Sequence, residues 1–270
     1  MRIVVFTVEN AEFAPMVLGP VLERRGSEVV AAFVSRSLFS VGWLKKRAGF
    51  LIRNRYPFCI RLGDWARYAR RALGGRRGTV LGYLRARGIP ADYLDEIRSE
   101  ATRARLSRLD ADVFLFLLFD KIAGPKFLSL PRLGTFNLHM GKLPEHRGGL
   151  SAFWVLRFGD DEAGATLHRA VPELDAGEIV AEVRLSVRTK SMHELMNATF
   201  SAAGPMVAQA LDRIEAGSWT PVDTAGRPTG YYRAARRTRA RICLTSGNFG
   251  ARALASAGIG PRQTLLEGLR

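Results

Sequence analysis

The stretch VFLFLLF, residues Val113–Phe119, decides the fold because it is the most strongly apolar run in the chain and lies between Asp112 and Asp120. A helix that crosses a membrane needs about 20 mostly apolar residues, so this run is too short for a transmembrane span. A short apolar run between charged residues is typical of a strand buried on both faces of a parallel sheet. The stretch therefore predicts an α/β fold without a transmembrane segment.

The amino-terminal residues extend this prediction to an open parallel sheet. RIVVFTV at Arg2–Val8 is a β-branched run that predicts a first strand, followed by a helix at Phe13–Arg25 and a second strand at Glu28–Val34. Strand, helix and strand of these lengths form a βαβ unit. No GxGxxG motif follows the first strand, which disfavours a dinucleotide site of the Rossmann type.

The same patterns place further elements along the chain. The expected strands are Thr135–Leu138, Ala165–Arg169 and Glu178–Leu185, and the expected helices are Tyr93–Leu109, Ser151–Phe158 and residues 191–216, with a short one within 124–130. Ser151 is expected to be a helix N-cap, and Ser191 to Glu194 has the pattern of a capping box. The order of elements predicts an open, mostly parallel Rossmann-like sheet with helices on both faces.

We expect residues 1–216 to form one domain that carries two basic appendages. Residues 35–88 mix aromatic residues with arginine and are predicted to be a basic helical insertion. Residues 217–270 are rich in glycine, arginine and alanine and are predicted to be a small basic C-terminal extension. This extension is too short for a further β-barrel domain of ordinary size.

The net charge of +16 comes from 41 Lys and Arg against 25 Asp and Glu, and it is unevenly spread. Thirteen basic residues and one acid lie between Val41 and Pro90, and nine arginines and one acid lie between Gly226 and Arg270. Such an excess attracts anionic partners. Two interpretations stay open: a nucleic acid or membrane surface binds there, or arginine stems simply cover aromatic side chains that pack on the domain.

Cysteine and histidine usage indicates a reducing compartment and no metal centre. Cys59 and Cys243 form no CxxC motif and are too few for a disulfide framework. The amino terminus shows no secretory signal, so a cytoplasmic location is expected. The four histidines are dispersed and show no metal-ligand spacing.

Chemistry is concentrated in TFNLHMGKLPEHRGG, residues Thr135–Gly149. On a strand, Asn137 and His139 project from the same face, at the end of the sheet where open α/β folds bind ligands. Asp175 begins a turn further along the chain. An amide that donates to an oxyanion, an imidazole that carries a proton and a carboxylate that tunes it suit acyl transfer. No GxSxG motif is present, which favours direct transfer to an amine without a covalent enzyme intermediate.

These motifs resemble the catalytic domain of the folate-dependent formyltransferases. FNLHMGKLPEHRGG is similar to the family's Asn-x-His followed by S-L-L-P-x-x-R-G, and ATLHRAVPELDAGEIV is similar to its T-x-H and D-x-G-P-I segment. The resemblance implies that Asn137, His139 and Asp175 are catalytic. It further implies that protonated His139 stabilises the oxyanion and that Asp175 raises the pKa of His139 through its charge.

The resemblance also implies the cofactor, 10-formyltetrahydrofolate, and the residues around it. The cofactor-binding residues would be Leu118, Phe119, Asp120, Lys121, Ile122, Ala123, Gly177 and Ile179, and the substrate-binding residues would be Lys142, Arg147 and His168. Two positions depart from the family pattern: Gly141 and Lys142 precede Leu143 where the family has a serine, and Glu178 replaces the proline of D-x-G-P.

Three functions follow as expectations. The first is N-formylation of the primary amine of an anionic metabolite, such as an amino sugar on a nucleotide, or an amino acid or carrier-bound amine in natural-product assembly. The second is formylation of an aminoacyl-tRNA, which the short C-terminal extension disfavours. The third is a catalytically silent member of the fold that binds nucleic acid or an anionic membrane through residues 41–90. The oligomeric state and the identity of the acceptor amine stay open.

Overall fold

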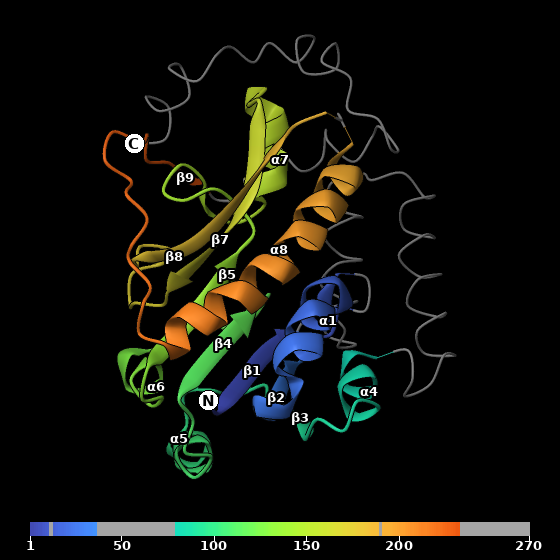
Figure 1. The fold of residues 1–270 in the computed structure, drawn as a ribbon, viewed down its shortest axis with the longest axis vertical. Coiled ribbons are helices and arrows are strands. Elements are labelled where there is room, and N and C mark those ends of the chain that lie inside the picture. The colour runs from blue at the N-terminus through green and yellow to red at the C-terminus, as the bar shows by residue number, and fades with distance from the viewer. Residues whose placement is uncertain (11–12, 37–78, 189–190, 233–270) are drawn as a thin grey trace, which may run out of the picture.

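The computed structural model describes residues 1–10, 13–36, 79–188 and 191–232 (Figure 1). Most of the predicted insertion and the end of the predicted C-terminal extension lie outside these residues. A seven-stranded sheet has the order β3-β2-β1-β4-β5-β7-β8, and two short strands, β6 and β9, pair separately. The strands are β1 (Ile3–Val8), β2 (Val29–Ser35), β3 (Ala91–Tyr93), β4 (Val113–Leu117), β5 (Gly134–His139), β6 (Arg147–Gly148), β7 (Glu162–Arg169), β8 (Ile179–Ser186) and β9 (Tyr231–Tyr232).

The sheet is parallel from β3 to β5 and antiparallel beyond β5. β1 pairs in parallel with β2 and β4, β2 with β3, and β4 with β5, whereas β7 runs antiparallel to both β5 and β8. All residues of β1 and β4 are buried, because helices cover both faces of these central strands. The predicted mostly parallel Rossmann-like sheet is confirmed.

Alternate residues of β1 enter two separate cores, one on each face of the sheet. Ile3 and Val5 pack with the apolar residues of α1 and α8, while Val4 and Phe6 pack with residues of α5 and α6. Figure 1 shows α1 and α8 side by side across one face. The α-helices are α1 (Ala14–Arg25), α4 (Val80–Arg85), α5 (Glu100–Ser107), α6 (Pro125–Leu128), α7 (Ser151–Phe158) and α8 (Met192–Glu215), with a 3₁₀ turn at Gly26–Glu28.

Several sequence predictions hold at the level of single elements. The predicted first strand, first helix and second strand match β1, α1 and β2 to within one residue at each end. The predicted capping box is also present, since the Ser191 side chain accepts a hydrogen bond from the Glu194 backbone N–H at the start of α8. None of the helices within the described residues is long and apolar enough to cross a membrane.

Two predictions about helix starts are wrong. The helix expected from Tyr93 begins only at Glu100, because Ser99 caps it and Tyr93 pairs with Val34 as the end of β3. Ser151 is not an N-cap but the first residue of α7. Leu150, in the left-handed region at φ 64°, takes the cap position.

Glu9 connects the first strand to the chain that follows the insertion. Its carboxylate is buried, accepts hydrogen bonds from the backbone N–H groups of Val80 and Leu81 at 3.0 Å each, and contacts the Tyr93 hydroxyl at 3.3 Å. The first N–H groups of a helix have no partner inside that helix, and a negative charge there also interacts favourably with the helix dipole. Glu9 therefore holds α4 against the end of β1.

We predict that Glu9→Ala lowers the free energy of unfolding by about 2 to 3 kcal/mol, because two buried backbone donors lose a charged acceptor. Glu9→Gln, which keeps one acceptor oxygen, should lose about half as much. Urea unfolding of the two variants measures both values. A loss below about 0.5 kcal/mol in Glu9→Ala, the range of ordinary surface substitutions, would contradict the capping role.

Candidate functional site

The pairing of β5 with β7 brings the predicted polar residues together. Asn137 lies opposite His168, and His139 lies opposite Thr166, in the antiparallel register. Asn137 and His139 are two residues apart and project from the same face of β5. Asn137 is half-buried, whereas His139 and His168 are buried.

Asp175 reaches the same place from the turn between β7 and β8. Its carboxylate is buried, with Oδ2 3.5 Å from His139 Nδ1 and Oδ1 3.7 Å from His168 Nε2. The backbone N–H of Gly148 donates to Oδ2 at 2.9 Å. The predicted convergence of an amide, an imidazole and a carboxylate is thus present in the structure, with His168 as a fourth member. We call Asn137, His139, His168 and Asp175 the polar cluster.

Backbone carbonyls determine which nitrogen of each histidine carries a proton, because a carbonyl oxygen only accepts. His139 Nε2 lies 2.7 Å from the His146 carbonyl oxygen and therefore donates, which leaves Nδ1 facing Asp175. His168 Nδ1 donates to the Arg169 carbonyl at 2.9 Å, so its Nε2 accepts from Asn137 Nδ2 at 3.0 Å. His168 thereby orients the Asn137 amide.

Burial outweighs charge at His139. Desolvation lowers the pKa of this imidazole below its ordinary value, although Asp175 and the His146 carbonyl act in the opposite direction. Asp175 therefore raises the pKa of His139 as predicted, but the net shift is downward because the ring is buried. At neutral pH the lowered pKa of His139 favours the neutral ring, with its proton on Nε2.

Asp175 stays ionised. Burial opposes its charge, but the proximity of the His168 and His139 rings and the hydrogen bond from the Gly148 N–H together hold its pKa below the ordinary value.

Gly141 explains one departure from the family motif. A Cβ at this position would lie 2.8 Å from His139 Nε2 and 2.7 Å from Ser151 Cβ, closer than such atoms approach. The Gly141 carbonyl accepts from Thr166 Oγ1 at 2.8 Å, which holds the backbone against β7. Glycine lets the loop after β5 pass directly over the His139 ring.

The residues predicted to bind the cofactor lie in the loop after β4 and in the turn between β7 and β8, except for Ile179, which is the first residue of β8. Leu118 is in the left-handed region at φ 64°. Phe119 is half-buried and packs its ring on Phe6 at 5.4 Å, whereas Ala123 is buried. The other members divide by exposure: Lys121 and Gly177 are half-buried, Asp120 and Ile122 are exposed, and Ile179 is buried.

Gly177 and two exposed apolar side chains shape these loops. A Cβ on Gly177 would overlap the Arg169 carbonyl oxygen, so glycine is needed where the turn crosses the end of β7. Ile122 in the first loop is 64% exposed, and Leu174 beside Asp175 is 47% exposed. Leu174 therefore leaves an apolar side chain in solvent directly before Asp175 of the polar cluster.

The three residues expected to bind the acceptor differ in their surroundings. His168 belongs to the polar cluster. The Lys142 ammonium lies 3.7 Å from Glu162 Oε2. Glu162 is the first residue of β7, and at the usual rise per strand residue it is about 13 Å from Thr166, which lies opposite His139. Arg147 is half-buried, and its Nε is buried without a hydrogen-bond partner among the described residues.

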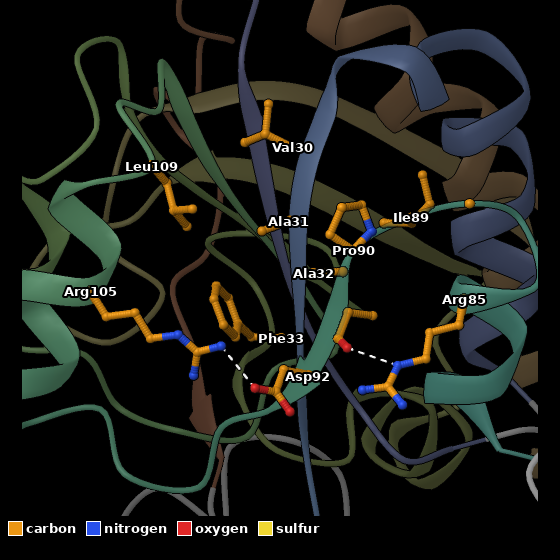
Figure 2. Close-up of a pocket in the computed structure, with 12 residues that line it drawn as sticks. Val30, Ala31, Ala32, Phe33, Arg85, Ile89, Pro90, Asp92, Arg105 and Leu109 are labelled. Atoms are coloured by element: carbon orange, nitrogen blue, oxygen red, sulfur yellow. Dashed lines mark hydrogen bonds and ion pairs between the residues drawn. The ribbon is translucent and has the colours of Figure 1, made fainter.

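A cavity of about 620 Å³ lies elsewhere, beside β2 and β3 at the opposite edge of the sheet (Figure 2). Its two guanidinium groups are already engaged, since Arg105 pairs with Asp92 at 2.8 Å and Arg85 donates to the Ala91 carbonyl at 2.9 Å. The polar cluster is therefore the better candidate site. Within the described parts of the chain, no three His, Cys, Asp or Glu residues are grouped to hold a metal ion.

Comparison with known proteins finds a family similarity over the part of the chain that contains the polar cluster. A family model described as formyl transferase matches residues 89–211, a range that contains β4, β5, β7, β8 and the whole polar cluster. These residues are therefore similar to a formyl transferase domain. The resemblance to the folate-dependent formyltransferases that the motifs predicted is confirmed.

One relative of known name is a methionyl-tRNA formyltransferase. The methionyl-tRNA formyltransferase of Bacillus licheniformis is 31% identical over 136 residues, which are 50% of this chain and 43% of that protein. The chain thus spans less than half of that relative.

Two solved structures share the fold. Phosphoribosylglycinamide formyltransferase from Anaplasma phagocytophilum has a TM-score of 0.60 at 17% identity, covering 86% of this chain and 97% of that one. An N-formyltransferase from Helicobacter canadensis, in complex with folinic acid and dTDP-3-aminofucose, has a TM-score of 0.56 at 15% identity, covering 86% and 71%.

We predict that Asp175→Asn lowers the pKa of His139 further. The carboxylate charge favours the imidazolium, so removing it leaves the burial that already disfavours that form. NMR titration of the imidazole in the free protein measures the effect, with the His139 signal assigned by its loss in His139→Gln. Asp161→Asn, which neutralises an exposed carboxylate just before β7, is the control and should leave the titration unchanged. An unchanged or raised pKa in Asp175→Asn would contradict the contact.

Proposed function

We propose that this chain is an N-formyltransferase that transfers the formyl group of 10-formyltetrahydrofolate to a primary amine. The observation that carries the proposal is the polar cluster, which joins an amide donor, a neutral imidazole and an ionised carboxylate inside a formyl transferase domain. In this proposal residues 1–216 form the catalytic domain.

The two loops suit the cofactor. The chain would hold 10-formyltetrahydrofolate between the loop Leu118–Ala123, which offers backbone groups and exposed Ile122, and the turn from Leu174 to Ile179. When bound, this group supplies an activated formyl carbon. The backbone groups and apolar side chains of the loops fit a flat, partly apolar ring system with polar edges.

Within the polar cluster, each residue has one role. Asn137 Nδ2 uses one N–H on His168 and directs the other to the formyl oxygen, where negative charge develops. His139 Nδ1 would take the proton that the amine loses as the amine nitrogen bonds to the formyl carbon. It would then give that proton to the donor nitrogen as the bond between this nitrogen and the formyl carbon breaks. Asp175 stabilises the imidazolium that results, and Gly148 holds Asp175 in place.

A neutral His139 at rest suits this sequence of events. An imidazole that is already protonated cannot accept the proton of the amine. The lowered pKa of His139 therefore favours the neutral imidazole, which can act as a base at the start of the reaction. The nearby Asp175 carboxylate then stabilises the imidazolium that forms during the reaction.

The acceptor is proposed to be an anionic metabolite with a primary amine, such as a nucleotide-linked amino sugar. The Helicobacter canadensis structure with dTDP-3-aminofucose supports this class. The similarity to a methionyl-tRNA formyltransferase supports the alternative, an aminoacyl-tRNA. A panel of amines incubated with 10-formyltetrahydrofolate, and scored for the mass gain of one formyl group, distinguishes the two.

A silent member of the fold is the rival outcome. Tight, salt-sensitive binding of RNA or anionic vesicles together with no binding of the formyl donor would favour that reading and overturn the enzymatic one.

We predict that Asn137→Ala, His139→Ala and Asp175→Asn each lower kcat by about a hundredfold or more, since each removes a group that acts on developing charge. His193→Ala is a matched control, because this histidine lies in the first turn of α8, outside the polar cluster, and should keep kcat within about twofold. Circular dichroism confirms that each variant is folded. Near wild-type rates in two of the three cluster variants would refute the assignment.

A further inference from the structure

The loop after β5 supplies two backbone groups to the polar cluster. We call Leu143–Gly148 the site loop. Its His146 carbonyl accepts from His139 Nε2 at 2.7 Å, and its Gly148 N–H donates to Asp175 Oδ2 at 2.9 Å. Two of the three predicted catalytic side chains, His139 and Asp175, are therefore held by the backbone of one short segment, and its placement determines theirs.

A segment more than 80 residues away in the sequence binds this loop. We call residues 222–232 the C-terminal strap. Figure 1 shows it, in orange, leaving α8 and running along the β8 side of the sheet to β9. Its first residue, Val222, donates to the Ile179 carbonyl at 2.9 Å, and its last two residues form β9, which pairs with β6 of the site loop.

The contacts between strap and loop are mostly backbone hydrogen bonds. Gly230 N donates to the Pro144 carbonyl at 3.1 Å, and the Gly230 carbonyl accepts from Arg147 N at 2.9 Å. A Cβ on Gly230 would lie 2.5 Å from the Glu145 carbonyl oxygen, so the two backbones approach as closely as glycine allows. The strap is thus fitted to the loop and not merely adjacent to it.

Side chains fasten the strap at two further points. Arg227 donates to both carboxylate oxygens of Glu182 on β8, at 2.8 and 3.1 Å, and reaches the Leu143 carbonyl at 3.5 Å. Tyr232 stacks on Trp154 of α7 with ring centroids 5.1 Å apart and lies 5.6 Å from the His146 ring.

One peptide unit connects the strap to His139. The carbonyl of His146 and the N–H of Arg147 belong to the same peptide group, so His139 Nε2–H, this peptide and the Gly230 carbonyl form a continuous chain of hydrogen bonds. Donation by the Arg147 N–H polarises the His146 carbonyl and makes it a stronger acceptor. A stronger acceptor on Nε2 stabilises the protonated imidazole.

We propose that the C-terminal strap is a positioning element of the site: it orients and polarises the peptide between His146 and Arg147, and through it sets the geometry and proton affinity of His139. The inference rests on the proposed function for its kinetic consequences. The groups that face His139 are Asp175 from the β7–β8 turn, His168 from β7, and His146 with the neighbouring Ser151 hydroxyl. The strap acts on one of these contacts, the His146 carbonyl.

The main test compares Gly230→Ala with Gly149→Ala in the full chain. The first substitution places a methyl group against the Glu145 carbonyl and pushes the strap away, whereas a methyl group on Gly149 meets no atom within 4 Å. We expect Gly230→Ala to lower the pKa of His139, read by NMR titration without any ligand, and Gly149→Ala to leave it unchanged. In the formylation assay, kcat of Gly230→Ala should fall about ten- to hundredfold and the acidic limb of its pH profile should move to lower pH, with KM for the formyl donor within about twofold.

A second pair of variants covers the case in which Gly230→Ala does not fold. Arg227→Gln breaks the ion pair between the strap and Glu182. Arg184→Gln is the control: Arg184 also pairs with Glu182, but it lies on β8 and not in the strap. Only Arg227→Gln should move the His139 titration, and Arg227→Lys should restore part of it.

These outcomes separate the inference from the proposed function. A His139 titration that is unchanged in both Gly230→Ala and Arg227→Gln, with only thermal stability reduced, would overturn the positioning role. If the wild-type protein formylates no amine, the titration still decides whether the strap acts on His139.

Discussion

The antiparallel pairing of β7 with β5 is the contact on which the site depends. Its register sets His168 opposite Asn137 and Thr166 opposite His139, and a slip of one residue would turn these side chains to the other face of the sheet. The pairing of β7 with β8 changes register between Leu167 and His168, the place where the site begins. Bulges of this kind re-aim a side chain and are common beside functional sites. The turn that follows then returns Asp175 to the two histidines.

Two opposing effects act on the imidazole held by this pairing. Burial removes water from His139 and disfavours its charged form, while Asp175 and the His146 carbonyl favour that form. Because burial prevails, the ring is neutral at rest, yet both groups that stabilise a proton are already in position. Little rearrangement is needed when a proton arrives, which is the property expected of a preorganised base. The glycine at 141 belongs to the same arrangement, since a larger residue would displace the loop that covers the ring.

Local patterns in the sequence were sufficient for the elements that depend on local properties. The apolar runs of β1, β2 and β4 and the capping box at Ser191 act over a few residues, and each is where the sequence predicted it. Elements that depend on distant pairing could not be found this way. β3, with three residues, and β9, with two, are too short to show a period, and they exist because β2 and β6 bind them. The net downward shift of the His139 pKa could not be predicted from the sequence for the same reason, since burial is a property of the folded chain.

The charge distribution around the site bears on how an anionic acceptor could be recognised. Although the chain is strongly basic, Lys142, Arg184 and Arg227 are engaged with Glu145, Glu162 and Glu182 across β7, β8 and the strap. A cation already paired with a carboxylate offers less to a ligand, because binding must first replace that partner. Arg147 differs: it lies in β6 between the two backbone groups that hold the polar cluster, and its buried Nε has no hydrogen-bond partner among the described residues. An unsatisfied buried donor is costly, and an anion that reaches it removes that cost. Of the two cations predicted to contact the acceptor, Arg147 is therefore the better placed.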